Sequence, residues 1–226
     1  TRNLALAQVL NNKADLDQAW QKMGGSLYSL GKLDESLEAY KSALALREQL
    51  NDEQETALAL LDVGVTLTAK REFADALANY ARSRELYDKA GNSAGIAAVL
   101  LNTALVHYLT RDWPKSLETA TLAADFARRA DDQDLFWQAR HRAGKTFYRM
   151  NDLAAARKAM TEAIATIETM RPPAARTQQP RYYENKIAPY LAMVDIALSE
   201  GQGNEAFHFT QRAKAPIGQP AATDAD

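Results

Sequence analysis

The sequence repeats itself every 40 residues, and this period constrains the fold more than any local motif does. Gly24, Gly64, Ala104 and Gly144 stand one period apart. Other columns of the repeat keep their character too: Trp20, Leu60, Leu100 and Arg140; Leu33, Phe73, Trp113 and Leu153; Ser36, Ala76, Ser116 and Ala156; Ala43, Ser83, Ala123 and Ala163. A fixed period of this length is typical of solenoids, in which each unit buries its apolar side against its neighbours. We therefore expect one all-α array of stacked repeats.

Each unit contains two amphipathic helices, because its apolar residues follow the i, i+3, i+4, i+7 spacing of a helix face. In the first unit these residues are Trp20, Met23, Gly24 and Leu27, then Leu33, Leu37, Tyr40 and Leu44. Gly31 and Lys32 separate the two helices, and Asp34 is the expected N-cap of the second. The small residue at 24, 64, 104 and 144 predicts a close helix crossing, with the large residue of column 20 filling the space beside it.

Four single residues carry local expectations. Asp112 is predicted to cap a helix that has Pro114 in its first turn, where proline is accepted. Pro189 should start a helix or kink it. Arg140 stands in a column of large apolar residues, so its helix is either rotated or sends this side chain out to solvent.

The period also divides the chain. Residues 1–12 read as the second helix of a truncated upstream unit; 13–52, 53–92, 93–132 and 133–170 are complete units; 171–181 is a Pro-rich loop; 182–215 is a fifth pair; 216–226 is a flexible tail. The partial first unit and the missing initial Met indicate a piece of a longer protein.

Composition argues against several classes of function. A formal net charge of −2 gives no basic field for nucleic acid or an anionic membrane. No apolar run approaches the ~20 residues of a membrane span. Cysteine is absent, which removes disulfides, thiolate nucleophiles and Cys-based metal sites. The absence of cysteine fits both a cytoplasmic and an exported protein. We favour the cytoplasm and leave export open.

The repeat resembles the tetratricopeptide repeat (TPR) family. Trp20, Met23, Gly24 and Leu27 match its first-helix motif, and Leu33, Ser36, Tyr40 and Ala43 match its second-helix motif. The usual TPR unit has about 34 residues, so the helices are expected to be longer here. The resemblance implies a right-handed superhelical solenoid of antiparallel helix pairs whose first helices line a concave groove. It further implies a scaffold that binds a protein or peptide, as a module of a larger bacterial protein.

The C-terminal part looks like the last TPR pair that precedes the caspase-like peptidase domain of bacterial CHAT proteins. The resemblance rests on Glu205-Ala206-Phe207 and Arg212-Ala213-Lys214-Ala215. It implies the alternative of a regulatory or sensor arm, with the peptidase beyond Asp226. A third alternative is a structural module that associates with itself through the open ends of the solenoid.

The sequence contains no recognisable catalytic or metal-binding motif. No pair among His107, His141 and His208 has the spacing of a helical metal site, and no HExxH, Walker loop or GxSxG occurs. His107 is expected to be a hydrogen-bonded core residue and His208 an exposed one. Gly24 and Gly25 read as a packing contact within a helix rather than a phosphate cradle. We expect no enzyme activity, no cofactor and no metal in this chain.

The candidate ligand-binding groove is therefore taken from the first helices. Its residues are Gln21 and Tyr28 in the first unit; Leu58, Leu61 and Val65 in the second; Leu101, Asn102, Leu105 and Tyr108 in the third; and His141, Arg142, Lys145, Tyr148 and Arg149 in the fourth. Leu191, Asp195 and Leu198 hold the same places in the fifth unit. The leucines either face a partner or pack between repeats. The carboxylate clamp of some TPR proteins is not implied, because Gln21 and Gly25 stand where that clamp needs Lys and Asn.

Helical spacing brings Arg142, Lys145 and Arg149 together. The cluster either receives an acidic segment, a phosphate or a C-terminal carboxylate, or it is a solvated face offset by Asp131, Asp132 and Asp134. The expected partner is a protein or peptide, with no nucleic acid and no membrane.

Overall fold

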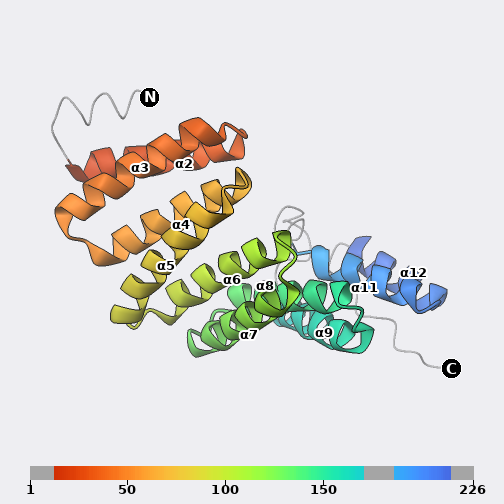
Figure 1. Ribbon diagram of the computed structural model, residues 1–226. Coiled ribbons are helices and arrows are strands. Elements are labelled where there is room, and N and C mark those ends of the chain that lie inside the picture. Colours follow the sequence, from red (N-terminus) through yellow and green to blue (C-terminus); the bar gives the residue numbers. More distant parts are fainter. Residues whose placement is uncertain (1–12, 171–185, 215–226) are drawn as a thin grey trace. The chain divides into compact units, whose positions relative to one another are not determined.

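A computed structural model describes residues 13–170 and 186–214 of the chain. Ten α-helices and no strand occur in this part, in the order α2 (Lys13–Ser29), α3 (Leu33–Leu50), α4 (Glu53–Ala69), α5 (Phe73–Lys89), α6 (Ser93–Leu109), α7 (Trp113–Arg129), α8 (Gln133–Arg149), α9 (Leu153–Thr169), α11 (Ala188–Ser199) and α12 (Gly203–Lys214). Consecutive helices form antiparallel pairs (Figure 1). The prediction of an all-α helical repeat is confirmed.

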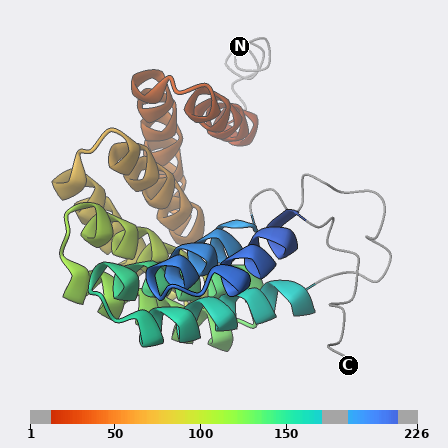
Figure 2. The same ribbon diagram turned by 90° about the vertical axis from the view of Figure 1, so that its right-hand side faces the viewer.

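The chain forms two compact units, Thr1–Val106 and His107–Asp226. In the first, α3 packs against α2 and α4, and α4 against α5. In the second, α8 packs against α7 and α9, and the pair α11–α12 stacks on α9 (Figure 2). The truncated upstream helix (1–12), the Pro-rich loop (171–181) and the flexible tail (216–226) predicted from the sequence lie outside the described residues.

Every turn between helices in the described stretches has the same backbone geometry. A residue with positive φ follows each helix, and these residues are Gly31, Asn51, Arg71, Gly91, Arg111, Asp131, Asn151 and Gly201. The next residue donates its N–H to the carbonyl five residues back, as Lys32 does to Leu27 at 2.9 Å and Asp152 to Phe147 at 3.0 Å. This is the Schellman ending of a helix. Up to Asn151 the turns therefore recur every 20 residues, at half the period of the side-chain pattern.

Helix starts agree with the sequence in part. Asp112 accepts a hydrogen bond from the N–H of Lys115 and has proline just after it, as predicted. Pro189 lies in the first turn of α11 and so starts that helix rather than kinking it. The N-cap assignment of Asp34 is wrong, because α3 already begins at Leu33, with Lys32 at its N-cap and no side-chain cap. Asp34 instead pairs with Lys70 at 2.8 Å.

The predicted close crossing lies inside three helix pairs, α2–α3, α4–α5 and α8–α9. A Cβ atom added to Gly64 would lie 2.4 Å from Cε1 of Tyr80, and one added to Gly24 would lie 2.8 Å from Cδ1 of Tyr40. At Gly144 the nearest atom would be Cε of Met160, at 2.8 Å. The covering side chain thus comes from the second helix, and not from column 20 as the sequence suggested.

The core of the second unit lies under its last helix pair. Met160 and Ile164 of α9 are buried there against Met193 and Ile196 of α11 and Phe209 of α12. Arg140 is neither rotated out nor sent to solvent, because its Nε forms an ion pair with Glu162 of α9 at 2.7 Å. Its charge is therefore compensated inside the α8–α9 pair.

Candidate partner-binding face

The buried residues of α8 are flanked by the predicted groove residues. Trp137, Ala143 and Gly144 are buried, and Asp132 starts the helix by accepting a hydrogen bond from the N–H of Leu135. Beside the buried residues, His141, Arg142, Lys145 and Tyr148 are half-buried and Arg149 is exposed. Positions three, four and seven residues apart share one helix face, so these side chains lie together.

Three cations of α8 converge on Tyr108, near the end of α6. The guanidinium of Arg142 lies 5.5 Å from the centre of the Tyr108 ring, and the ammonium of Lys145 lies 5.4 Å from it. The Nε of Arg149 donates to the Tyr108 hydroxyl at 3.1 Å. Cation–π contacts of this kind contribute ~0.5–2 kcal/mol each, more when water is excluded. We call these four residues the Tyr108 cluster.

No carboxylate of the described residues neutralises the Tyr108 cluster by an ion pair. Of the three aspartates offered by the sequence, Asp132 caps α8 and Asp134 accepts from Trp137 at 3.1 Å and from Lys186 at 2.7 Å. Asp131 is exposed and forms no ion pair with the described cations. Nε of Arg142 is shielded from solvent and has no hydrogen-bond partner within 13–170 and 186–214. Burial lowers the pKa of Arg142, because desolvation disfavours its charged form. The alternative of a solvated face offset by those aspartates therefore does not describe Arg142.

His141 lies beside the cluster and stays neutral. Burial, together with the positive charges of Arg142 and Lys145, lowers its pKa to about 3. Its ring centre is 6.4 Å from that of Trp137, on the preceding turn. His107 is likewise half-buried with a pKa lowered by burial, whereas His208 is exposed as expected.

An apolar strip on α11 adjoins this face. Tyr148 of α8 shares a hydrogen bond with Ser199 of α11, with 3.0 Å between the two oxygens. Leu191 and Leu198 lie seven residues apart, on one face of α11, and are 47% and 60% exposed. Asp195 lies between them, is exposed, and forms no ion pair with the described cations.

In the compact unit Thr1–Val106 the predicted groove residues are mostly engaged in packing. Six of them are half-buried rather than exposed: Leu58, Leu61, Val65, Leu101, Asn102 and Leu105. The amide of Asn102 donates to the carbonyl of Ala98 at 2.8 Å. Gln21 donates to Asp62 at 2.5 Å and thereby ties α2 to α4. Only Tyr28, 37% exposed, presents a large ring to solvent.

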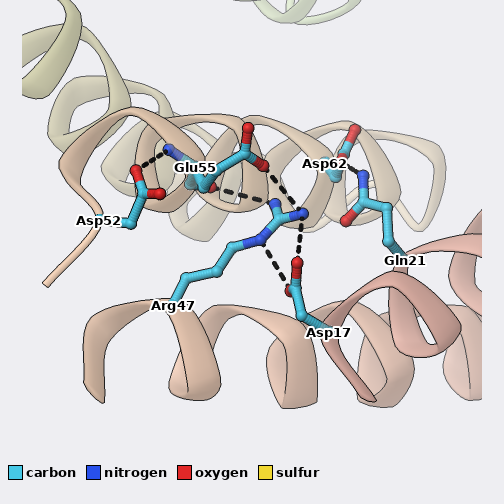
Figure 3. Close-up of polar contacts among 6 residues, drawn as sticks. All are labelled: Asp17, Gln21, Arg47, Asp52, Glu55 and Asp62. Atoms are coloured by element: carbon cyan, nitrogen blue, oxygen red, sulfur yellow. Dashed lines mark hydrogen bonds and ion pairs between the residues drawn. The ribbon is translucent and has the colours of Figure 1, made fainter. Parts of the chain in front are cut away.

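A polar network in the first unit had no place in the sequence-based prediction (Figure 3). Arg47 of α3 has a 5% exposed side chain and donates twice to Asp17 of α2, at 2.8 and 3.2 Å. It also binds the carbonyl of Glu55 in α4 at 3.0 Å and its carboxylate at 3.1 Å. Close by, burial raises the pKa of Asp62 despite its hydrogen bond from Gln21.

The repeat columns contain the signal that would have found this network. Asp17 shares a column with Ala57, Ala97 and Trp137, and Arg47 shares one with Tyr87, Ala127 and Ile167. Two opposite charges therefore replace apolar residues in the same 40-residue repeat. In the fourth repeat the equivalent residues, Trp137 and Ile167, belong to one buried apolar cluster.

Residues 15–89, which cover α2 to α5, match the family model of the tetratricopeptide repeat. The fold is that of a TPR-like helical repeat. No curated protein matches the sequence. The match to the TPR family and the similar solved structures do not show the resemblance to CHAT proteins.

Several solved structures resemble this TPR-like chain at low sequence identity. BtubC (BKLC) from P. vanneervenii has a TM-score of 0.78 at 14% identity, with 100% of this chain and 92% of that chain covered. A Rap protein complexed with Competence and Sporulation Factor has a TM-score of 0.73 at 15% identity, with 91% and 55% covered. MamA has a TM-score of 0.55 at 14% identity, with 93% and 96% covered. At these identities the likeness concerns the fold alone.

None of the helices in the described residues combines the length and apolar character needed to cross a bilayer. Within 13–170 and 186–214, no group of three or more His, Asp or Glu side chains is placed to hold a metal ion.

Proposed function

We propose that this chain is a protein-interaction module whose second unit binds an acidic segment of a partner protein. The observation that carries the proposal is the Tyr108 cluster, where three cations gather without an acidic partner among the described residues. Most buried charges in proteins are paired, because an unpaired one costs several kcal/mol. A carboxylate-bearing partner would supply the missing charge.

The apolar strip on α11 supports a segment rather than a lone ion as the occupant. Leu191 and Leu198 expose apolar area on α11, the helix whose Ser199 is hydrogen-bonded to Tyr148. Exposed apolar residues beside a charged cluster are typical of sites for short segments, which combine apolar anchors with a charged contact. We therefore infer a segment that carries Asp or Glu together with one or more large apolar residues.

The comparisons support this role at the level of fold. TPR-like chains include the Rap protein, whose structure holds Competence and Sporulation Factor. The groove as a whole, including Gln21 and the leucines of the first unit, stays a prediction. So do the two alternatives, a sensor arm of a CHAT peptidase and a self-associating module; no observation on the described residues favours either.

Selection from a random displayed peptide library tests the proposal without a known partner. The wild-type chain should enrich acidic peptides with large apolar residues. Arg142→Glu combined with Lys145→Glu should lower the affinity of the enriched peptides by about tenfold or more. The matched control is Lys89→Glu with Lys158→Glu, which makes the same charge change at exposed positions of α5 and α9.

Circular dichroism should show unchanged helicity in both double variants. If the enriched peptides bind the Arg142/Lys145 variant as well as they bind the control, the Tyr108 cluster is not the binding site. Loss of folding in that variant alone would also remove the groove assignment, because residues of a binding face are not needed for the core.

A further inference from the structure

The charge of the Tyr108 cluster specifies its ligand more closely. Three cations act on one ring, and Asp195 is the one acidic residue that the α11 strip contributes. His141 adds no positive charge, because its pKa of about 3 leaves it neutral. A single carboxylate, with one negative charge, would leave the face with an excess of positive charge.

Most hydrogen-bond donors of the cluster also have no partner among the described residues. Arg142 and Lys145 donate no hydrogen bond to any described residue, and Arg149 uses only its Nε, toward Tyr108. The same helix pairs its other guanidinium, Arg140, with Glu162 at 2.7 Å. The chain thus supplies a carboxylate for one arginine of α8 and none for its neighbour two residues later.

We propose that the Tyr108 cluster binds a dianionic phosphate monoester, presented by the partner segment as a phosphorylated side chain. This rests on the function proposed above and names the charged group of the partner. A phosphate monoester carries about −1.5 to −2 charges at pH 7 and three strong acceptor oxygens. Two guanidinium groups and one ammonium group match both its charge and its number of acceptors.

The site separates a phosphate from a carboxylate by its pH dependence. The second pKa of a phosphate monoester is about 6, so the dianion fraction rises about tenfold between pH 5 and pH 7. His141, which lies beside the cluster, does not change its charge in this range. The other titratable groups here are Tyr108 within the cluster, Tyr148 on the same face of α8, and Asp195 on the adjoining strip of α11. A ligand of fixed charge reports what these groups contribute.

NMR of the arginine Nε–H groups gives a direct readout of anion binding. Phenyl phosphate should shift the Nε signals of Arg142 and Arg149, with an affinity that rises about tenfold from pH 5 to pH 7. Methanesulfonate, a monoanion throughout, should bind more weakly and without this rise at the same ionic strength. Arg142→Gln should abolish the phosphate response, and Lys158→Gln, at an exposed position of α9, should leave it unchanged.

A peptide series then separates the sources of the phosphate. The three peptides share one leucine-containing sequence and differ at a single position, which is phosphoserine, glutamate or serine. The phosphoserine peptide should bind about tenfold more tightly than the glutamate peptide, and the serine peptide should bind least tightly. Leu198→Ser tests the contribution of the α11 leucines. It should weaken binding of the phosphopeptide but not binding of phenyl phosphate. Equal effects on both ligands, or none on either, would overturn the assignment to a partner segment in favour of a small phosphorylated molecule.

Failure of this inference differs from failure of the proposed function. Equal responses to phenyl phosphate and methanesulfonate, or a flat pH profile, would overturn the phosphate assignment. Acidic library peptides that still depend on Arg142 and Lys145 would leave the interaction module standing in that case.

Discussion

Gly64 and Gly24 each lie beneath a tyrosine ring of the following helix, where even a methyl group meets ring carbons at less than 3 Å. Tyr80 is 1% exposed and its hydroxyl is hydrogen-bonded to Thr68 at 2.9 Å, so its ring has no free direction in which to move. Gly144 differs, because the atom above it is the terminal methyl of Met160, a flexible side chain.

Alanine substitutions at these glycines should therefore rank by the rigidity of the covering side chain. Gly64→Ala should destabilise the chain by ~1–3 kcal/mol through overpacking. Gly144→Ala should cost less, since Met160 can adjust. The control is Gly25→Ala, where a Cβ would lie 3.4 Å from the Tyr40 hydroxyl and alanine favours the helix by ~1 kcal/mol. Urea denaturation measures all three, and a Gly64 variant as stable as the Gly25 variant would contradict the close crossing.

His141 gives the second unit a pH-dependent stability. Its pKa is about 3 in the folded chain and 6.5 ordinarily, so the unfolded chain binds more protons between these values. Stability must then fall as the pH falls below about 6.5. Between pH 6.5 and 5 the loss is on the order of 2 kcal/mol.

His141→Gln should remove that part of the slope. The pKa of His107 is also lowered by burial, and this contribution remains in both proteins. The measurement is the free energy of unfolding of both proteins at several pH values from 7 to 5. Parallel curves would mean that His141 is as accessible to protons in the folded chain as in the unfolded one.

The repeating turns carry residues that are poorly suited to them. Arg71 and Arg111 adopt φ of 66° and 62°, a left-handed conformation that glycine adopts at Gly31, Gly91 and Gly201. A side chain in this region costs ~1–2 kcal/mol relative to the right-handed conformation. Arg111 is exposed and forms no ion pair among the described residues, so its side chain contributes little in return.

Arg111→Gly should thus stabilise the chain by ~0.5–1 kcal/mol, after allowing for the greater freedom of glycine in the unfolded state. The reverse change at the equivalent place, Gly91→Ala, should destabilise it by ~1 kcal/mol. Thermal unfolding of the two variants provides the comparison. A lower melting temperature of the Arg111→Gly variant would contradict this prediction and would mean that the Arg111 side chain stabilises the folded chain.

The Asp17–Arg47 pair joins three helices and replaces an apolar contact found in the fourth unit. Asp17→Ala alone should destabilise the chain by ~3 kcal/mol, because it removes the main partner of a buried guanidinium. Asp17→Ala with Arg47→Tyr copies the residues of the next unit, Ala57 and Tyr87, and should regain most of the loss. Denaturation midpoints of the single and double variants test this, and additive losses would contradict it.

Repetition explains which features the sequence could predict. The helix pairs and the small residue beneath the second helix recur every 40 residues, so several copies indicate each of them. The Asp17–Arg47 pair occurs once, and only its place in two apolar columns indicates it. The wrong N-cap assignment of Asp34 has a similar cause. The turn recurs every 20 residues, but glycine marks only some of its copies, so glycine alone does not fix where the next helix begins.

The candidate site divides in the same way. Spacing along α8 was enough to bring Arg142, Lys145 and Arg149 onto one face. Their convergence on Tyr108 could not be predicted, because it depends on how the end of α6 lies against α8. The engagement of Gln21 with Asp62, 41 residues away, depends likewise on the packing of two first helices.

At the scale of the whole molecule, the contacts between described helices are largely those of sequence neighbours within each unit. In such an array stability is approximately a sum of repeat and nearest-neighbour terms, so opening in one place need not open the whole chain. Hydrogen exchange resolves this, because it reports the opening free energy of each amide.

Gly64→Ala should therefore raise amide exchange most in α4 and α5 of the first unit. Met160→Ala leaves a cavity beneath α11 and costs ~2–5 kcal/mol, so it should raise exchange most in α8, α9 and α11. The two variants act as controls for each other, since each leaves the other unit's core intact. Equal loss of protection across both units in both variants would show that the chain opens as one cooperative structure. A segment bound at the Tyr108 cluster should then protect α8 and α11 first if opening is local, and every helix equally if it is not.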